Sequence, residues 1–381
     1  MIYLDYNATT PVDERVLAEM LPYFTEHFGN ASSNTHAYGW YAQGAIEKAR
    51  QQVADFIGAE ASEIVFTSGS TESINTAIKG VFEAYQSKGN HIITCKTEHK
   101  AVLDVCAFLE ENGAEITYLN VDQEGRIDLE ELRNSFTDKT ILVAIMAANN
   151  ETGVIQDLEK ISEITHEYNA ILFSDTTQLG GKLALDVNDL GLDLCCISAH
   201  KLYGPKGVGA LYVRRKAPRV SLIPLIHGGG HENGKRSGTL NVTGIVGLGK
   251  ACEIARLEYW DNNTHTSKLR GYIEHQLLEI PQFRINGSTR YRLYNTANLY
   301  FPPLNDGSSL FSKIKNDYAV SLGSACTSAH KEPSHVLMAM GLNKEEAENS
   351  IRFSLGKDSK IEDIHKLTIN ILSLYNINSS V

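Results

Sequence analysis

The chain has 381 residues, of which 42% are hydrophobic and 21% charged, and it contains only 9 prolines. These values describe an ordinary globular protein with enough material for one large and one smaller domain. The formal net charge of −11 argues against broad electrostatic attraction to nucleic acid or to an anionic membrane.

The N-terminus predicts a strand and not a signal peptide, because Asp5 interrupts a short apolar run. No apolar stretch approaches the roughly 20 residues that cross a bilayer. The cysteines show neither paired metal-ligand spacing nor the density of a secreted scaffold; they are Cys95, Cys106, Cys195, Cys196, Cys252 and Cys326. We therefore expect a cytoplasmic protein with reduced thiols and no membrane association, in which the adjacent Cys195 and Cys196 serve packing.

Between residues 45 and 215, helical patterns alternate with short apolar runs. We expect helices over residues 45–57 and 72–86, and strands over residues 63–67, 90–94, 115–119, 140–145, 170–175 and 210–214. Strands interleaved with helices predict an α/β fold, with a mostly parallel sheet and helices on both faces. Residues 242–261 predict one long helix that leads into a second, C-terminal unit, and the N-terminal strand is compatible with either unit.

Residues 67–75 follow a predicted strand, open a predicted helix and carry several hydroxyls around one glycine. Ser70 and Thr71 then lie at a helix N-terminus, where free N–H groups and the positive end of the helix attract an anion. A capped helix with a flexible turn is the alternative, and the hydroxyls slightly favour a phosphate site.

Two further side chains follow predicted strands. His99 can stack on a planar cofactor or move protons, although a lone histidine is more often structural. Asp175 ends a buried strand, at the sheet edge where ligands bind in open α/β sheets. An acid there can hold a pyridinium nitrogen protonated; a helix N-cap is the alternative role for Asp175.

Lys201 ends the run Ser-Ala-His-Lys and precedes the glycine-punctuated residues 202–209. A lysine placed after two polar side chains can hold an aldehyde cofactor as a Schiff base. Cys326 lies far downstream in the small-residue loop 321–328. A lysine that forms imines and a cysteine on such a loop suggest covalent chemistry in which sulfur changes hands.

Two segments leave alternatives open. Residues 226–239 are very glycine-rich and weakly basic, which suits either an ordinary mobile loop or a second phosphate-facing loop. The two histidines in this segment have no third ligand at a helpful spacing, so no metal is expected. Arg352 lies in an apolar, strand-like run and needs an anionic partner, which is either a substrate carboxylate or a structural salt bridge.

Taken together, these segments resemble the cysteine desulfurases of the NifS/IscS type, class V aminotransferase-like members of the fold-type I pyridoxal-phosphate enzymes. The resemblance runs from Tyr3 to Gly356 and rests on the order Thr-Ser-Gly-Ser-Thr-Glu, Thr-Glu-His, Asn-Asn-Glu-Thr-Gly, Asp-x-x-Gln, Ser-x-His-Lys and Gly-Ser-Ala-Cys-Thr-Ser. The expected organisation is a large cofactor-binding domain over residues 13–258. Residues 1–12 and 259–381 are expected to form a smaller α+β domain that carries the cysteine loop.

The resemblance implies a role for each matching residue. Lys201 would bind pyridoxal 5'-phosphate as a Schiff base, Asp175 would pair with the pyridine nitrogen, Gln178 would contact the phenolic oxygen, and His99 would stack on the ring. The implied phosphate ligands are the Ser70 amide, Thr71, Ser198, His200 and, across a dimer interface, Thr239. The implied substrate-carboxylate ligands are Asn150 and Arg352, and the implied sulfur-accepting nucleophile is Cys326.

The implied reaction converts L-cysteine to L-alanine and leaves a persulfide on Cys326 that is passed to an acceptor protein. The loop around Cys326 resembles the long-loop group I of the family. Transamination is an alternative activity, but it leaves Cys326 unexplained. An inactive binding subunit is a third hypothesis, and it does not explain why Lys201, Asp175, His99 and Cys326 are all present.

We expect a homodimer, because a glycine-rich loop needs a surface to hold it. The acidic charge favours an acceptor protein over direct contact with nucleic acid. The sequence ends soon after Tyr375, whereas housekeeping members of the family have a longer tail that helps to dock the iron–sulfur scaffold protein. On that ground a DndA- or SspA-like role in DNA phosphorothioation is the leading specialised hypothesis, ahead of general iron–sulfur cluster assembly, and tRNA thiolation is another such role.

Overall fold

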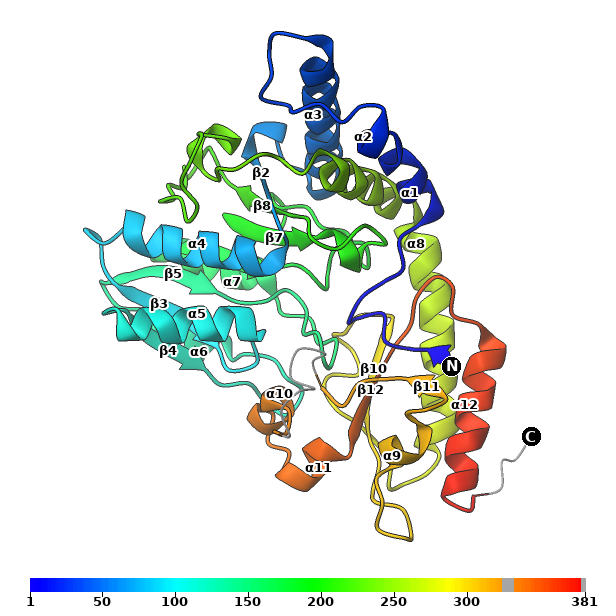
Figure 1. Cartoon of the computed structure of the whole chain (residues 1–381). Helices are drawn as coiled ribbons and strands as arrows, with labels where there is room; N and C mark the ends of the chain where they lie inside the picture. The colour runs from blue at the N-terminus through cyan, green and yellow to red at the C-terminus, as the bar shows by residue number, and fades with distance from the viewer. Residues whose placement is uncertain (324–331, 378–381) are drawn as a thin grey trace.

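A mixed sheet of seven strands forms the centre of the computed structural model, which describes residues 1–323 and 332–377. The strands lie in the order β2-β8-β7-β6-β5-β3-β4 (Figure 1). Their bounds are β2 Ile64–Thr67, β3 His91–Cys95, β4 Glu115–Leu119, β5 Thr140–Ala144, β6 Ile171–Asp175, β7 Leu194–Ser198 and β8 Gly209–Val213. Both antiparallel pairings in this sheet involve β8 and the other four pairings are parallel, which confirms the expected mostly parallel α/β sheet.

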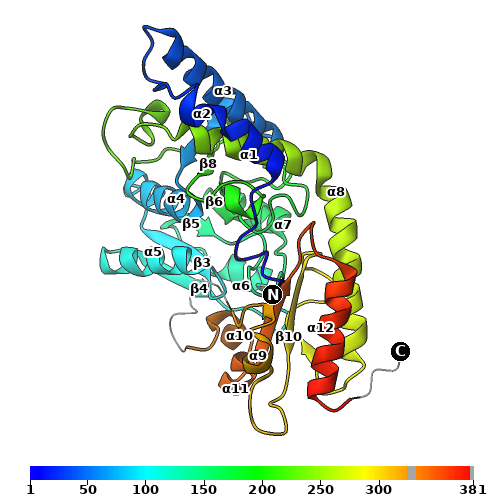
Figure 2. The same ribbon diagram turned by 45° about the vertical axis from the view of Figure 1, so that its right-hand side comes forward.

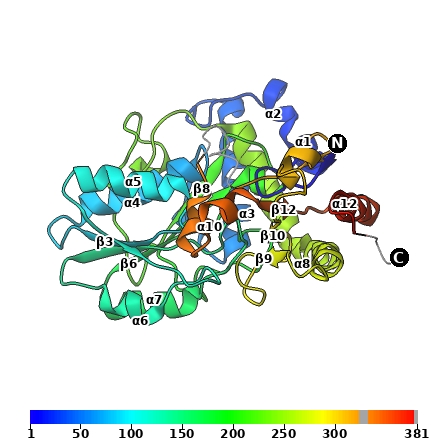
Figure 3. The ribbon, with the colours of Figure 1, turned by 90° about the horizontal axis from the view of Figure 1, so that it is seen from below.

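Helices cover both faces of this sheet (Figure 3). Helices α4 (Ser70–Ala84) and α5 (Lys100–Glu111) lie on one face, and α6 (Leu129–Asn134) and α7 (Leu158–Glu167) lie on the other. Because side chains alternate along a strand, Ile92 packs with α4 and α5 while its neighbour Ile93 packs into the opposite core. Apart from the edge strand β4, the strands are therefore buried on both sides, as a parallel sheet requires.

A long helix joins the sheet to the rest of the molecule (Figure 2). Helix α8 (Val242–Leu278) has 37 residues and continues well beyond the expected end at residue 261. Its first half packs against α3 (Ala37–Ile57), near α1 (Glu14–Met20) and α2 (Pro22–Thr25). Its second half buries Leu269, Ile273 and Leu277 in a separate apolar core, so packing extends the helix through polar residues of modest helix propensity.

Most C-terminal elements surround that separate core, whereas α10 and α11 pack against each other in a small cluster of their own. Strands β9 (Arg284–Ile285), β10 (Thr296–Tyr300) and β12 (Ser350–Ser354) form an antiparallel sheet. The helices are α9 Leu310–Ile314, α10 His335–Ala339, α11 Lys344–Glu348 and α12 Ile361–Leu374. Strand β1 (Ile2–Tyr3) pairs with β11 (Tyr318–Ala319), so the N-terminal strand returns to this unit. The division at residues 12/13 and 258/259 stays a prediction.

The segment after β1 runs from the small sheet to the edge of the large one. Asp5 forms a β-bridge with Ser354, and the Thr10 N–H donates to the carbonyl oxygen of His200 at 3.0 Å. Short 3-10 turns complete the chain at Ala61–Glu63, Ala199–Lys201 and Glu232–Gly234. Within the described ranges, no helix combines the length and the apolarity that a membrane crossing demands.

Candidate active site

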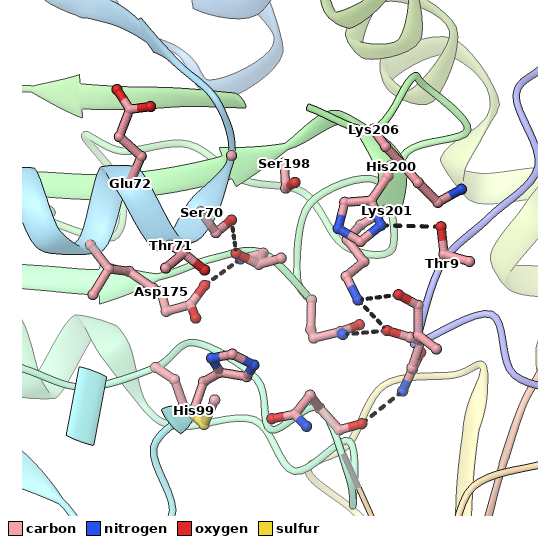
Figure 4. Close-up of a pocket in the computed structure, with 18 of the residues that line it drawn as sticks. Thr9, Ser70, Thr71, Glu72, His99, Asp175, Ser198, His200, Lys201 and Lys206 are labelled. Atoms are coloured by element: carbon pink, nitrogen blue, oxygen red, sulfur yellow. Dashed lines mark hydrogen bonds between the residues drawn. The ribbon is translucent and has the colours of Figure 1, made fainter. Parts of the chain in front are cut away.

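A cavity of about 430 Å³ opens where the N-terminal segment meets the carboxyl ends of the central strands (Figure 4). This volume is within the range of small-molecule and cofactor sites. The expected site residues that line it are Ser70, Thr71, His99, Asn150, Asp175, Gln178, Ser198, His200, Lys201 and Arg352. Residues from distant parts of the sequence therefore come together at the edge of the sheet where open α/β folds bind ligands.

One end of the cavity is formed by the first turn of α4. The N-cap residue, Gly69, provides no side-chain cap, so the first N–H groups of the helix are available to an anion. Gly69 has φ 147° and ψ −178°, a conformation essentially restricted to glycine. A Cβ atom on Gly209 would lie 2.7 Å from the Gly69 Cα, so this turn also requires glycine on the neighbouring strand.

Hydroxyls and a neutral histidine surround this end of the cavity. Ser70 Oγ lies 2.5 Å from Thr177 Oγ1, and His200 Nδ1 lies 3.1 Å from Thr9 Oγ1. Burial, with the nearby cations Lys201 and Lys206, lowers the pKa of His200 to about 4. The imidazole is therefore neutral near pH 7 and can donate one N–H to an anion while the other nitrogen accepts.

Lys201 ends the short 3-10 turn after β7, and its side chain points into the cavity (Figure 4). The ammonium donates to the carbonyl oxygens of Asn7 and, at 2.8 Å, Ala8. The N-terminal segment thus holds the amine in the cavity. This contact could not be found from the sequence pattern around Lys201, because about 190 residues separate the partners.

Asp175 ends β6 and is buried. The Thr177 N–H donates to its Oδ1 at 2.9 Å, and the Cys196 thiol donates to the same oxygen at 3.3 Å. Both donors use Oδ1, which leaves Oδ2 for a ligand. The alternative role as a helix N-cap is wrong, because a turn and no helix follows Asp175 in the described chain.

His99 makes a structural contact and also lines the cavity. It is the N-cap of α5, and its Nδ1 accepts the Ala101 N–H at 3.1 Å. Because Nδ1 is the acceptor, the proton of the neutral ring lies on Nε2. The ring also lines the cavity, across from Lys201, so a structural contact fixes the orientation of a side chain that faces the ligand space.

Arg352 lies on β12 with a side chain that is 1% exposed. Its Nη1 donates to the Asn150 carbonyl oxygen at 2.7 Å, and its Nη2 donates to Asp5 Oδ1 at 2.6 Å. The structural salt bridge that the sequence allowed therefore exists. Arg352 nevertheless lines the cavity, and its buried Nε has no hydrogen-bond partner among the described residues, so the salt bridge leaves one donor of the guanidinium unsatisfied.

Two expected residues are not placed in this cavity. Thr239 is exposed and does not line the cavity of its own chain. Cys326 lies outside the described residues. The other cysteines are all buried: burial raises the pKa of Cys95, Cys106 and Cys195 to about 12 and that of Cys196 and Cys252 further above its ordinary value. These five thiols hold too little thiolate near neutral pH to act as nucleophiles.

The glycine-rich loop that carries Thr239 is held by its own chain. Glu232 makes a bidentate ion pair with Arg50 at 2.8 Å, and Arg236 donates to Glu72 at 2.8 Å. The argument that glycine content alone makes this loop depend on a partner surface is therefore wrong, because ion pairs compensate for its flexible backbone.

One of the two histidines in this loop is also bound within the chain. His231 Nε2 lies 2.8 Å from Ser32 Oγ. Among the residues that the structure describes, no group of three His, Cys, Asp or Glu side chains is arranged to hold a metal ion.

Several residues that line the cavity were missed by the sequence analysis: Asn7, Thr9, Glu72, Met146, Thr177 and Lys206. Asn7 and Thr9 belong to the N-terminal segment that begins the resemblance, which was the only available signal. Thr177 lies between Asp175 and Gln178 in the sequence, and its hydroxyl oxygen lies 2.5 Å from Ser70 Oγ.

The arrangement fits pyridoxal phosphate on grounds of donor chemistry. An uncapped helix N-terminus with hydroxyls suits the phosphate, a buried carboxylate suits a protonated ring nitrogen, and an amine suits the aldehyde. The buried arginine donor at the other end suits the carboxylate of an amino acid.

Comparison with known proteins agrees with this fit. A profile of the aminotransferase class-V family matches residues 2–367. A protein named cysteine desulfurase IscS from Anaeromyxobacter sp. (strain Fw109-5) is 54% identical over 364 residues, which are 95% of this chain and 89% of that protein. A solved NifS-like protein superposes with a TM-score of 0.89 at 40% identity, over 98% of this chain and 99% of its own. The structure of SspA in complex with cysteine has a TM-score of 0.83 at 38% identity, over 93% of this chain and 99% of its own.

Proposed function

Because the chain belongs to the aminotransferase class-V family, we propose that the cavity around Lys201 binds pyridoxal phosphate and releases sulfur from L-cysteine. The protein is a cysteine desulfurase, as its IscS and NifS-like relatives are. The observation that carries this proposal is the convergence of Lys201, Asp175 and Arg352 on one cavity. An amine for the aldehyde, an acid for the ring nitrogen and a cation for an amino-acid carboxylate together define an amino-acid site.

When bound, pyridoxal phosphate supplies an electron sink that stabilises negative charge at the Cα of the substrate. The residues around it would divide the remaining work. Lys201 would hold the cofactor and, as a free amine, would accept the Cα proton. Asp175 Oδ2 keeps the ring nitrogen protonated. Arg352 and Asn150 hold the substrate carboxylate, which fixes the direction of the Cα–H bond toward Lys201.

Cys326 would then take the sulfur atom. Its thiolate attacks the substrate sulfur, an S–S bond forms, and the C–S bond breaks with its electron pair left on the carbon, which is protonated to give alanine. The thiol lost from the substrate remains on the enzyme as a persulfide, so atoms and electrons balance without an added oxidant. The burial and raised pKa of the other five cysteines support the assignment of Cys326 as the nucleophile.

A homodimer is part of this proposal. Large exposed apolar side chains gather on α1, α2, the segment after α2 and the start of α3, among them Phe24 and Phe28, which are 60% and 64% exposed. Exposed apolar patches of this kind mark contact surfaces. The contact between Ser32 and His231 joins this surface to the loop of Thr239. A second copy of the chain on this surface would bring that threonine toward the neighbouring cavity, where it would bind the phosphate.

The acceptor would be a protein that receives the persulfide sulfur, in a cytoplasmic pathway. DNA phosphorothioation, tRNA thiolation and iron–sulfur cluster assembly each use such an acceptor. The IscS-named relative, at 54% identity, is closer in sequence than SspA, at 38%, which supports the cluster-assembly pathway over the phosphorothioation pathway. Deletion of the gene, followed by assay of DNA phosphorothioate, thiolated tRNA and iron–sulfur enzymes, separates the three.

The desulfurase activity is tested directly with the purified protein. Cysteine and a thiol reductant should give alanine and sulfide in equal amounts, and borohydride should fix the cofactor covalently on Lys201. The Lys201→Ala variant should give neither product and no covalent label. Alanine release at the wild-type rate by this variant would refute the assignment. Keto-acid formation in place of sulfide would support transamination instead.

A further inference from the structure

Lys182 is a half-buried amine that none of the roles above uses. Its side chain lines a small cavity of about 50 Å³ that also touches Lys201. Its Nζ lies 2.6 Å from Gln178 Oε1 and 3.4 Å from Asn7 Oδ1. Burial and the neighbouring cations Lys201 and Arg352 hold the pKa of Lys182 well below its ordinary value. Removing an amine from water costs free energy unless hydrogen bonds compensate, so the contacts of Lys182 must offset that cost.

The donors and acceptors around the Asn7 side-chain amide permit only one orientation of that amide. The carbonyl oxygen of Asn150 can only accept, so the end of the Asn7 amide that faces it at 3.3 Å must be Nδ2. The other end, Oδ1, then faces Nδ2 of Asn295 at 3.0 Å and Nζ of Lys182. Asn295 Nδ2 also donates to the Leu355 carbonyl oxygen at 3.2 Å. The Asn7 amide therefore has one permitted orientation.

Lys182 also contacts the side-chain amide of Gln178. The lysine donates N–H groups to two oxygens, Asn7 Oδ1 and Gln178 Oε1. With Oε1 bound to Lys182, the NH2 group of Gln178 lies on the opposite side, where it donates to the Asn7 backbone oxygen at 3.0 Å. An amide NH2 has two hydrogens, and Gln178 lines the cofactor cavity. One hydrogen binds Asn7 and the other remains for a ligand.

We propose that Lys182 is a positioning residue that, together with the Asn7 backbone oxygen, fixes the Gln178 side-chain amide so that an N–H, and not the carbonyl oxygen, faces the phenolic oxygen of the bound cofactor. The proposal rests on the proposed function, because it assumes pyridoxal phosphate on Lys201. The phenolic oxygen carries negative charge beside the protonated nitrogen of the Lys201 linkage. An N–H from Gln178 would stabilise the negative phenolic oxygen and so lower the pKa of the lysine-linked nitrogen beside it. An amide oxygen in the same place would repel the phenolic oxygen and raise that pKa.

The test uses the visible absorbance of the cofactor-loaded enzyme as a function of pH, since the band changes when the lysine-linked nitrogen loses its proton. Lys182→Met keeps an unbranched side chain and removes the donors. The pH midpoint should rise by about one unit, the effect of one hydrogen bond to a charged group. Gln178→Leu, which removes the amide, should raise the midpoint at least as far.

The double variant decides between positioning and a separate effect. If Lys182 acts through Gln178, the Lys182→Met/Gln178→Leu enzyme should have the midpoint of Gln178→Leu alone. Additive shifts would overturn the proposal, and so would an unchanged midpoint in Lys182→Met beside a raised one in Gln178→Leu. These outcomes leave the proposed function intact, whereas a wild-type protein with no visible band would refute both.

A second variant covers the case in which Lys182→Met does not fold. Lys182→Arg keeps N–H donors for both oxygens, so its midpoint should equal that of the wild type. A shift in Lys182→Arg as large as that of Gln178→Leu would also overturn the proposal.

Discussion

The thiol of Cys196 donates a hydrogen bond to Oδ1 of Asp175 at 3.3 Å, from the neighbouring strand of the central sheet. The adjacent Cys195 points to the opposite core, because side chains alternate along β7. One cysteine therefore orients the carboxylate that would hold the ring nitrogen, and the other only packs. From the sequence alone packing is expected for both, although strand alternation already predicts that they face opposite sides.

Cys196→Ala should weaken pyridoxal phosphate binding about fivefold, because it removes one donor worth about 1 kcal/mol from Asp175. Cys196→Ser retains a donor and should restore most of the affinity. Cys195→Ala is the matched control: it should lower the free energy of unfolding and leave cofactor affinity unchanged. Spectral titration of the cofactor-free variants measures the affinities. Equal losses of affinity in Cys195→Ala and Cys196→Ala would contradict this division.

Local patterns predicted what local physics determines. The strands at residues 64–67, 91–95 and 171–175 were found within one residue, because short apolar runs between helices have few other conformations. The expected helix ended at residue 261, whereas α8 continues to Leu278. Its second half is stabilised by Leu269, Ile273 and Leu277 in a core built from distant segments. Propensity over residues 260–266 gives no sign of that packing.

The residues of the site also fall into those that local patterns predicted and those that depend on distant contacts. Side chains that follow strands, such as Asp175 and Lys201, were predicted because chain order places them at one sheet edge. Asn7 and Lys182 were not predicted, because their roles depend on contacts between segments far apart in the sequence. The salt bridge between Arg352 and Asp5 was left as an alternative for the same reason.

Arg352→Ala should raise the apparent KM for cysteine and lower kcat/KM by roughly 2–5 kcal/mol in transition-state binding, because a desolvated partner of the carboxylate is lost. Cofactor content should not change. Arg292→Ala is the control, since Arg292 is equally enclosed but pairs with Glu274 away from the cavity. Steady-state kinetics of both variants decide the matter. An unaltered KM in Arg352→Ala would leave only the salt bridge to Asp5.

The cofactor-free protein should lose stability as the pH falls from about 6.5 toward 4, in part through His200. The folded chain lowers the pKa of His200 from 6.5 to about 4, so in this interval the unfolded chain binds a proton that the folded chain does not. Protonation therefore favours unfolding, and the stabilising contribution is complete only above about pH 6.5.

Urea unfolding at pH 7 and pH 5 measures this effect. His200→Asn should reduce the stability difference between the two pH values by about 2 kcal/mol. His275→Asn is the control, because that side chain is 73% exposed, and it should behave as the wild type does. A His200→Asn variant with the wild-type pH dependence would show that His200 is not the responsible group.

Cys326→Ser should keep the cofactor and its spectrum but form no protein persulfide, because a hydroxyl is a poor nucleophile toward sulfur. Mass spectrometry after incubation with cysteine detects the added sulfur. Cys252→Ser should still form the persulfide, since that buried thiol has a raised pKa. Sulfur mapped to Cys95, Cys106 or Cys252 in the wild type, with Cys326 unmodified, would reject the assignment.

Thr239 should complete the cavity of the partner subunit, because it is exposed and does not line the cavity of its own chain. The Lys201→Ala homodimer should be inactive, and the Thr239→Ala homodimer should bind the cofactor poorly or turn over slowly. A mixed dimer has one cavity with both residues intact, since Lys201 comes from one chain and Thr239 from the other. Co-expression with two affinity tags isolates that dimer, which should recover about half of the wild-type activity per dimer. If Thr239 acted within its own chain, every cavity of the mixed dimer would lack one residue and no activity would return. A monomer by light scattering, with full activity, would reject the shared site altogether.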